Sequence, residues 1–266
     1  MKKFLFILFA FLGAILIYFI LTTYVMMDAS SSLSNSFLKK GNETGDYLDY
    51  LQLSYDYNKK IDNDSIPSNV KLYQTVNYDY DNKIYIYRYF VFISDLKQES
   101  IIDDPENTNK IPHIKVFLIT EGEDEMIYYS AEDEKVVGTE EAPELEFDWE
   151  NLNYIYFSFV IKRNSDYRID LLTNSGNVYK TMSFTHQGSD RTETMTREEY
   201  KELFDQIEGY TKKFDSDLFY NYLNKHMKSY IVWLGMGFYL LFMVGLYYLF
   251  FGKARVKFKK KNVDFE

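Results

Sequence analysis

The feature that most constrains this chain is a run of 22 uncharged residues, Tyr230–Phe251. A helix of this length rises about 1.5 Å per residue and spans the hydrocarbon core of a bilayer, which is about 30 Å thick. A basic cluster follows directly, within residues 252–261, and membrane proteins retain such clusters on the cytoplasmic side. The sequence therefore predicts a membrane-spanning helix whose C-terminal end faces the cytoplasm.

A second uncharged run, residues 4–27, follows two lysines at the N-terminus. A cleaved signal peptide is the rival interpretation, but its apolar region is only about 7–15 residues long and ends in small residues. Here the run has 24 residues, and the exit sequence VMMDAS at residues 25–30 is a poor cleavage site. We therefore expect an uncleaved anchor and a chain that crosses the cell membrane twice, with both termini in the cytoplasm and residues 28–229 outside.

Charge is distributed unevenly along the chain. Residues 28–229 contain 38 Asp and Glu against 22 Lys and Arg, whereas the two ends contain eight Lys and Arg against two acids. Short basic flanks orient a membrane protein and contact anionic lipid, so we expect the bilayer itself to be a partner of these residues. The basic residues expected at the membrane surface are Lys2, Lys3, Lys253, Arg255, Lys257, Lys259, Lys260 and Lys261. Nucleic-acid binding is disfavoured because an acidic domain repels the phosphate backbone.

The chain contains no cysteine, although its external domain would be free to form disulfides. Eukaryotic secreted domains of this size commonly contain disulfides. Together with the frequent Lys, Asn, Ile, Tyr and Phe, the absence indicates a bacterial protein. It also excludes thiol chemistry and cysteine-ligated metal sites.

The domain between the two runs combines helical and strand patterns. Residues 29–36 are rich in serine and indicate a linker. Residues 46–60 place Leu48, Leu51 and Tyr55 at helical spacing and predict one helix. We divide the chain into a cytoplasmic N-terminus (1–3), a first span (4–27), a stalk (28–40), an external domain (41–229), a second span (230–251) and a basic cytoplasmic tail (252–266).

The middle of the chain predicts β-strands. Residues 71–78 and 83–95 are rich in Tyr, Val, Ile and Phe and flank a turn sequence, which predicts a hairpin. The second of these strands is apolar on both faces, as is typical of a strand in the centre of a covered sheet. Further strands are predicted at residues 114–120, 126–130, 154–162, 167–172 and 178–184, and we expect the last three to form a meander.

Helical patterns return near the C-terminal end of the external domain. The sequence TREE at residues 196–199 is a capping box and predicts a helix that begins near Thr196. The fold class expected is therefore α+β, with two transmembrane helices flanking a mainly antiparallel, sandwich-like external domain that has helices at both ends.

Residues 121–150 carry 13 acidic side chains and form the most unusual segment of the domain. A calcium or cationic-partner site is one interpretation, because hard cations take several carboxylate oxygens. The segment lacks the ligand spacing and the glycine of a known calcium loop, so we favour a solvated loop.

Motifs for catalysis or cofactor binding do not occur in the sequence. The three histidines, His113, His186 and His226, lack zinc-ligand spacing, and we interpret each as a surface or packing residue. A carbohydrate-binding face could be lined by Tyr156 and Phe157, or by Tyr85 and Tyr87, but aromatic residues in strands more often form core or cross-strand pairs. We expect no catalytic, cofactor-binding or metal site, and no cofactor.

Small residues in the two apolar runs could let helices approach closely. They are Ala10, Gly13 and Ala14 in the first run and Gly235, Gly237 and Gly245 in the second. Packing between the two spans of one molecule is the simpler interpretation, and oligomer formation is the alternative. Neither run contains a charged residue, which argues against a proton relay or a charged transport pathway.

These observations favour a non-enzymatic, membrane-anchored protein with an accessory or sensor role. Its external domain would bind a partner protein or a component of the cell envelope. A homo-oligomeric channel or envelope scaffold is the alternative. An envelope enzyme that assembles two carboxylates in its fold is a third hypothesis.

Overall fold

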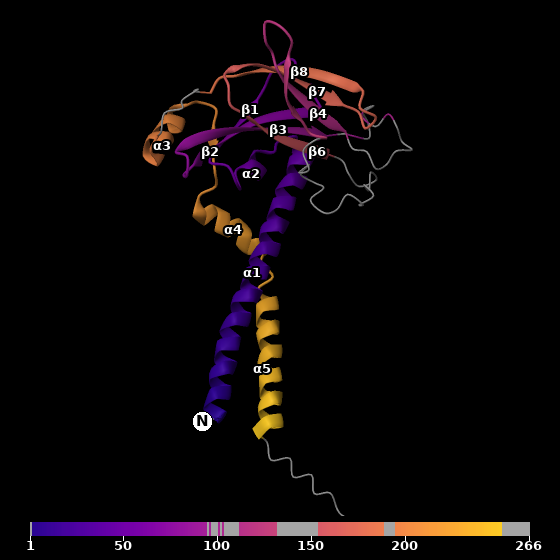
Figure 1. The fold of residues 1–266 in the computed structure, drawn as a ribbon. Coiled ribbons are helices and arrows are strands. Elements are labelled where there is room, and N and C mark those ends of the chain that lie inside the picture. Colours follow the sequence, from indigo (N-terminus) through magenta and orange to yellow (C-terminus); the bar gives the residue numbers. More distant parts are fainter. Residues whose placement is uncertain are drawn as a thin grey trace, which may run out of the picture. The chain divides into compact units, whose positions relative to one another are not determined.

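The computed structural model describes residues 2–94, 96, 101, 103, 112–131, 154–188 and 195–251. The chain forms two compact units, which are described separately. The helical unit consists of Met1–Leu33 and Asp217–Glu266, and the sheet unit consists of Ser34–Ser216. Figure 1 shows both units and labels their helices and most of their strands.

Three helices supply most of the described residues of the helical unit: most of α1 (Lys2–Thr44), nearly all of α4 (Ser216–His226), and α5 (Tyr230–Phe251). The predicted C-terminal helix is confirmed with the expected bounds. Both α1 and α5 are long and apolar enough to cross a membrane. Residues 227–229 separate α4 from α5, so these two helices are not continuous.

The serine-rich stalk expected at residues 28–40 is α-helical and belongs to α1. Ala29, Leu33 and Phe37 recur every fourth residue and are all buried. Residues at this spacing lie on one face of a helix, so burial of that face favours the helical conformation despite the intervening serines. The segment predicted as a linker is therefore part of a continuous helix.

The sheet unit contains two antiparallel sheets, which confirms the α+β class. The first sheet has the order β6-β3-β2-β1-β9 and consists of Tyr154–Ile161, Ile84–Ser94, Val70–Asp79, Tyr57–Ile61 and Thr211–Lys212. The second has the order β5-β4-β7-β8 and consists of Glu125–Tyr129, His113–Leu118, Ser165–Leu172 and Val178–His186. The remaining helices are α2 (Leu48–Leu51) and α3 (Arg197–Gln206).

Strand β3 lies between β6 and β2 and is covered on both faces, as its sequence predicts. Its residues Tyr89 and Val91 belong to a buried cluster to which both sheets contribute side chains. Phe90 and Phe92 point to the opposite face and join a second cluster that includes Tyr47. The predicted hairpin of β2 and β3 is confirmed, with cross-strand pairs from Val70↔Ile93 to Asp79↔Ile84.

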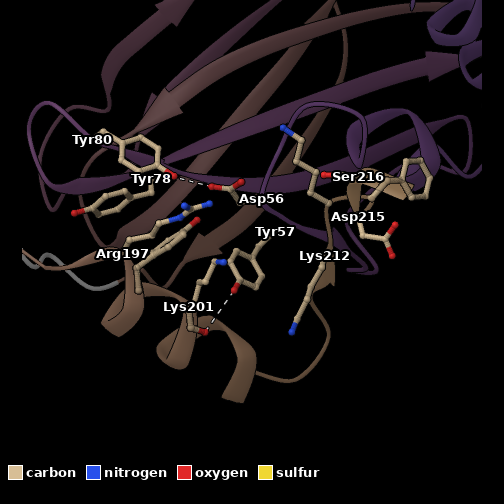
Figure 2. Close-up of a pocket in the computed structure, with 12 residues that line it drawn as sticks. Asp56, Tyr57, Tyr78, Tyr80, Arg197, Lys201, Lys212, Asp215 and Ser216 are labelled. Carbon is tan, nitrogen blue, oxygen red and sulfur yellow. Dashed lines mark hydrogen bonds between the residues drawn. The ribbon is translucent and has the colours of Figure 1, made fainter. Parts of the chain in front are cut away.

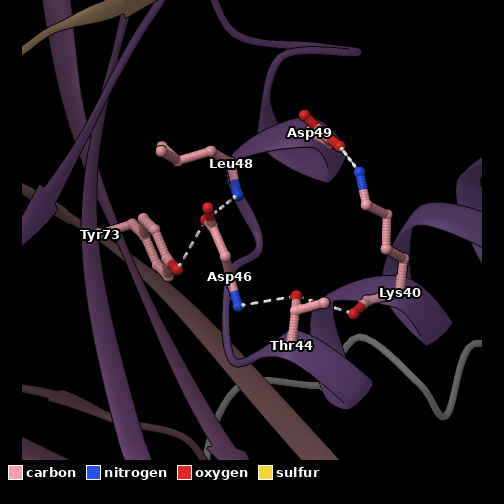
Figure 3. A network of polar contacts seen from close by, with 6 residues as sticks. All are labelled: Lys40, Thr44, Asp46, Leu48, Asp49 and Tyr73. Carbon is pink, nitrogen blue, oxygen red and sulfur yellow. Dashed lines mark hydrogen bonds and ion pairs between the residues drawn. The ribbon is translucent and has the colours of Figure 1, made fainter.

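A polar network ends α1 and begins α2 (Figure 3). Gly45 has a φ of 72°, a left-handed conformation that suits glycine at the end of a helix. The Thr44 hydroxyl accepts a hydrogen bond from the Asp46 main-chain N–H (3.3 Å). The Asp46 carboxylate in turn accepts hydrogen bonds from the Leu48 main-chain N–H (3.0 Å) and the Tyr73 hydroxyl (3.4 Å). These contacts join the turn to strand β2.

Two predictions about this unit were wrong. Residues 46–60 do not form one helix, because α2 has only four residues and β1 begins at Tyr57, which pairs with Val76 and Lys212. The last three strands do not form a meander, because β6 pairs with β3 in the first sheet while β7 and β8 lie in the second. Strand β6 is apolar on both faces, which suits the sheet that is covered on both sides.

Candidate functional site

A pocket of about 420 Å³ lies in the sheet unit beside the start of α3 (Figure 2). We call it the α3 pocket. Its walls come from β1 and β2, from α3, and from β9 with the residues that follow it. Its volume falls within the range of about 300–1,000 Å³ that is usual for small-molecule sites.

The capping box predicted from the sequence positions the first turn of α3. The Thr196 hydroxyl accepts a hydrogen bond from the Glu199 main-chain N–H (3.3 Å), and the Glu199 carboxylate accepts one from the Thr196 N–H (2.8 Å). The second of these bonds holds the pKa of Glu199 below its usual value. Arg197 follows directly and Lys201 lies one turn later, so both line the α3 pocket from one side of the helix.

Aromatic packing attaches α3 to the sheet. Tyr200 and Phe204 are each only 2% exposed. The Tyr57 ring centroid lies 5.5 Å from that of Tyr200 and 5.1 Å from that of Phe204. Tyr85 of β3 contacts the same two rings, at 5.8 and 5.5 Å. These ring contacts hold α3 on the sheet, so the positions of Arg197 and Lys201 are set by the packing of the opposite side of the helix.

The charge of the α3 pocket is opposite to that of the protein. The chain as a whole has a formal charge of −10, whereas four Lys and Arg residues and two Asp residues line the pocket. The cations are Arg197, Lys201, Lys212 and Lys213, and the acids are Asp56 and Asp215. Such a concentration of positive charge in an acidic domain creates a local potential that attracts anions.

One of the four cations already has an acidic partner. Lys212 Nζ lies 2.8 Å from an oxygen of Asp205, and the Tyr57 hydroxyl donates a hydrogen bond to the same carboxylate (2.7 Å). Lys212 and Tyr57 lower the pKa of Asp205 through these two bonds. Burial, and then the contact with Asp205, raise the pKa of Tyr57, so its hydroxyl stays protonated.

Aromatic rings form much of the remaining wall. The Tyr78 hydroxyl donates a hydrogen bond to the Met195 main-chain carbonyl, which fixes this ring. Tyr80 is 59% exposed at the rim, and the Arg197 guanidinium carbon lies 5.6 Å from its ring centroid. Cations placed over an aromatic face are attracted by the ring quadrupole. The α3 pocket thus combines fixed phenols, an exposed ring and positive charge, which suits recognition of an anion that carries a ring.

None of the four pocket cations was singled out from the sequence. The signals that could have found them are the Arg-x-x-x-Lys spacing directly after the capping box and the Lys-Lys pair at residues 212–213. Both stand out only once the surrounding acidity is considered. The strand β9 has only two residues and no clear signal in the sequence. Its pairing with β1 places the lysine pair beside that strand.

The predicted helix-packing residues fall into two groups within the helical unit. A side chain on Gly13 would overlap the Tyr239 hydroxyl, which donates a hydrogen bond to the Ala10 carbonyl (2.8 Å). A Cβ on Gly235 would lie 2.5 Å from Leu21 Cδ1. The structure thus brings these positions of α1 and α5 together.

The other small residues have more open surroundings. A Cβ on Gly237 or Gly245 would meet no described atom within 4 Å. Ala14 is half-buried. Of the basic residues predicted at the membrane surface, Lys2 and Lys3 are exposed in the first turn of α1, and the others, in the tail, lie outside the described residues.

The histidines have polar neighbours in the structure. His186 is buried, and its Nδ1 lies 2.7 Å from the Tyr89 hydroxyl and 3.2 Å from Gln74 Nε2. His113 Nδ1 lies 3.1 Å from the Ser130 hydroxyl, and His226 Nδ1 lies 3.1 Å from the Ser32 hydroxyl.

The sequence also offered a cation site in the acidic segment and a carbohydrate-binding face of aromatic residues. Across the described ranges, no group of three or more His, Cys, Asp or Glu is placed to hold a metal ion. Most of the acidic segment 121–150, from residue 132 onward, lies outside them. Tyr85 and Tyr156, considered as a carbohydrate-binding face, are both buried in the core clusters.

Fold and site together define an α+β protein with two antiparallel sheets, two helices apolar enough to cross a membrane and a cationic, aromatic pocket. No protein-family model, curated protein or solved structure matches the chain.

Proposed function

We propose that the chain is a two-span protein of a bacterial cell membrane, with both termini in the cytoplasm and residues 28–229 outside. Helices α1 and α5 supply two segments of suitable length and hydropathy, and each has a basic flank in the sequence. The two sheets would then form a sandwich in the external domain, a proposal supported by the buried cluster that they share. The chain has no native cysteine, so single cysteines can be introduced one at a time. Labelling of each by a membrane-impermeant thiol reagent tests the orientation, because only cysteines outside the membrane react in intact cells.

We further propose that the external domain is a non-enzymatic binding module with an accessory or sensor role. The observation that carries this proposal is the reversal of charge in the α3 pocket. The four cations are exposed to solvent and lie close to one another, so an anionic partner could form ion pairs with them at a small cost in desolvation. The partner would be a component of the cell envelope or another membrane protein.

The test is affinity purification of the full chain from native membranes in mild detergent. We expect a partner to co-purify with the unaltered protein and to be lost from the double variant Arg197→Gln, Lys201→Gln. Glutamine keeps helix propensity close to that of Arg and Lys, so α3 should remain formed. The matched control is Lys162→Gln with Arg163→Gln, which removes the same charge from an exposed turn outside the α3 pocket. Equal recovery of the partner by both variants would contradict the proposal.

A homo-oligomeric channel or scaffold is the second candidate. It is favoured by the open surroundings of Gly237 and Gly245 on α5, because small residues in transmembrane helices are common where a second helix packs. A detergent particle with a mass that is a multiple of 31.8 kDa, reduced to a monomer by Gly237→Leu, would support this function. A monomeric mass for the unaltered protein would exclude it.

A further inference from the structure

We infer that the α3 pocket binds an acidic saccharide, that is, a sugar bearing a carboxylate or a phosphate group. This inference rests on the proposed binding function and names the chemical class of its ligand. It depends on three properties of the pocket: cations available to an external anion, acceptors suited to hydroxyl groups, and an exposed aromatic ring.

Three cations are available for the anionic group. Among the described residues, no carboxylate forms an ion pair with Arg197, Lys201 or Lys213, in contrast to Lys212, which pairs with Asp205. Lys213 Nζ is 3.5 Å from the Ser54 main-chain carbonyl, a weak contact that a ligand could replace. Arginine binds carboxylate and phosphate through two parallel hydrogen bonds, whereas lysine acts as a point charge.

The two aspartates distinguish a saccharide from a simple anion. Asp56 lies in the pocket with the cations, and its carboxylate accepts a long hydrogen bond (3.4 Å) from the Tyr78 main-chain N–H. An ionised carboxylate offers about four acceptor positions and no donor. Its charge opposes every anion, but the hydroxyl groups of a sugar would offset that repulsion by donating hydrogen bonds to it, and inorganic phosphate or an acidic peptide has fewer such donors. Figure 2 shows Asp56 in the centre of the pocket, between Arg197 and the segment that contains Asp215.

The exposed ring supplies an apolar platform. Tyr80 is held edge-to-face against Tyr78, with a centroid distance of 5.1 Å, so its orientation is fixed although it is 59% exposed. The C–H groups on one face of a sugar ring are apolar and pack on aromatic rings, whereas its hydroxyl groups point outward. A pocket of about 420 Å³ accommodates a short saccharide but not a folded element of another protein.

The experiment is calorimetric titration of the full chain in detergent with trigalacturonate, glucose 1-phosphate, neutral maltotriose, inorganic phosphate and triglutamate. We expect trigalacturonate or glucose 1-phosphate to bind at least about tenfold more tightly than the other three, and the tighter of the two identifies carboxylate or phosphate as the preferred group. Arg197→Gln with Lys201→Gln should weaken binding of the preferred acidic sugar at least about tenfold, and Lys162→Gln with Arg163→Gln should leave it within about twofold. Tyr80→Ala, at an exposed position, should also weaken it.

Three results would overturn the inference. Tighter binding of triglutamate would assign the α3 pocket to acidic peptides. If maltotriose bound as tightly as the acidic sugars, the pocket would not recognise the negative charge of its ligand. If neither acidic sugar bound, acidic saccharides would be excluded as the ligand class. Loss of the co-purified native partner on Arg197→Gln with Lys201→Gln would still support the proposed binding function in each case, so failure of the two proposals can be told apart.

Discussion

Replacement of Gly13 by leucine should separate helix α1 from helix α5, whereas the same replacement at Gly237 should not. The Gly13 position faces Tyr239, and a Cβ there would overlap the Tyr239 hydroxyl oxygen and lie 3.2 Å from Cζ. The Gly237 position has no described atom within 4 Å. The two substitutions add the same side chain to an apolar helix, so any difference between them reports the contact and not the hydrophobicity.

The structure allows the size of the effect to be worked out. Tyr239 must move away from an added side chain, and the hydrogen bond from its hydroxyl to the Ala10 carbonyl would be lost. An interhelical hydrogen bond in a membrane contributes about 0.6 kcal/mol on average and at most about 1.7 kcal/mol. Overpacking adds about 1–3 kcal/mol. Gly13→Leu should therefore destabilise the helix pair by roughly 2–4 kcal/mol, at least about a 30-fold change in equilibrium, whereas Tyr239→Phe should cost only about 0.6 kcal/mol.

Cross-linking between the N-terminal end of α1 and the C-terminal end of α5 measures how closely the two helices pair. The rings of Phe6 and Phe251 lie 5.6 Å apart between centroids, and the chain has no cysteine of its own. Phe6→Cys with Phe251→Cys therefore creates the only two thiols, which a short bis-maleimide can join in isolated membranes. We expect rapid intrachain cross-linking in this background, a marked loss on adding Gly13→Leu, a small loss on adding Tyr239→Phe, and no loss on adding Gly237→Leu.

Unchanged cross-linking after Gly13→Leu, in a protein still inserted in the membrane, would refute the reasoning. Phe6→Cys alone controls for cross-links between molecules. If that single variant gives a dimer which Gly237→Leu abolishes, the open face of α5 contacts a second copy and the scaffold function gains support.

Three further predictions concern the sheet unit and can be measured as thermal unfolding of the full chain in detergent. Phe204→Ala, at a buried ring, should lower the free energy of unfolding by about 3–5 kcal/mol. Ile207→Ala, at a residue that is 40% exposed, should change it by less than about 0.5 kcal/mol. Similar costs for the two variants would contradict the packing of α3. Thr196→Ala removes the helix cap and should cost about 1 kcal/mol, and no loss would mean that the capping box is not formed in solution. Hydrogen bonds from the hydroxyl and amide groups of the turn after β7 lower the pKa of Asp103 to about 2, so its stabilising contribution is present above the unfolded pKa of about 3.9 and is lost as the pH falls towards 2. Asp103→Asn should therefore make unfolding less dependent on pH between about 5 and 2, and an unchanged dependence would contradict this role.

The elements that could be predicted from the sequence are those fixed by local interactions. The bounds of α5 follow from an uninterrupted apolar run, and the start of α3 follows from a capping box completed within four residues. The hairpin of β2 and β3 has a turn stabilised by Asp79, whose carboxylate accepts hydrogen bonds from the N–H groups of Asp81 and Asn82. Each signal and its structural partner lie within a few residues of each other.

The elements that were wrongly predicted depend on distant partners. The apolar spacing of residues 46–60 suits a helix, but Tyr57 and Asn58 pair with residues of β2 and β9, and these pairings decide the conformation. Outside a hairpin, local propensities do not indicate which strands meet, because those of Tyr and Asn do not specify a partner that is distant in the chain. The same limit explains why β6 could not be assigned to the first sheet.

The α3 pocket depends on such a distant pairing, which gives its occupancy a structural consequence. One wall, with Asp56 and three tyrosines, comes from β1, β2 and the residues beside them, whereas all four cations come from α3 and the residues around β9. Strand β9 is held by two cross-strand pairs and by the Thr211 hydroxyl, which donates a hydrogen bond to the Asn58 carbonyl (3.0 Å). A ligand that contacts both walls binds only the paired form and therefore stabilises the attachment of β9 by mass action. Because residues 211–215 lead directly into α4, binding in the pocket would stabilise the segment through which the chain leaves the sheet unit, as the proposed sensor role requires.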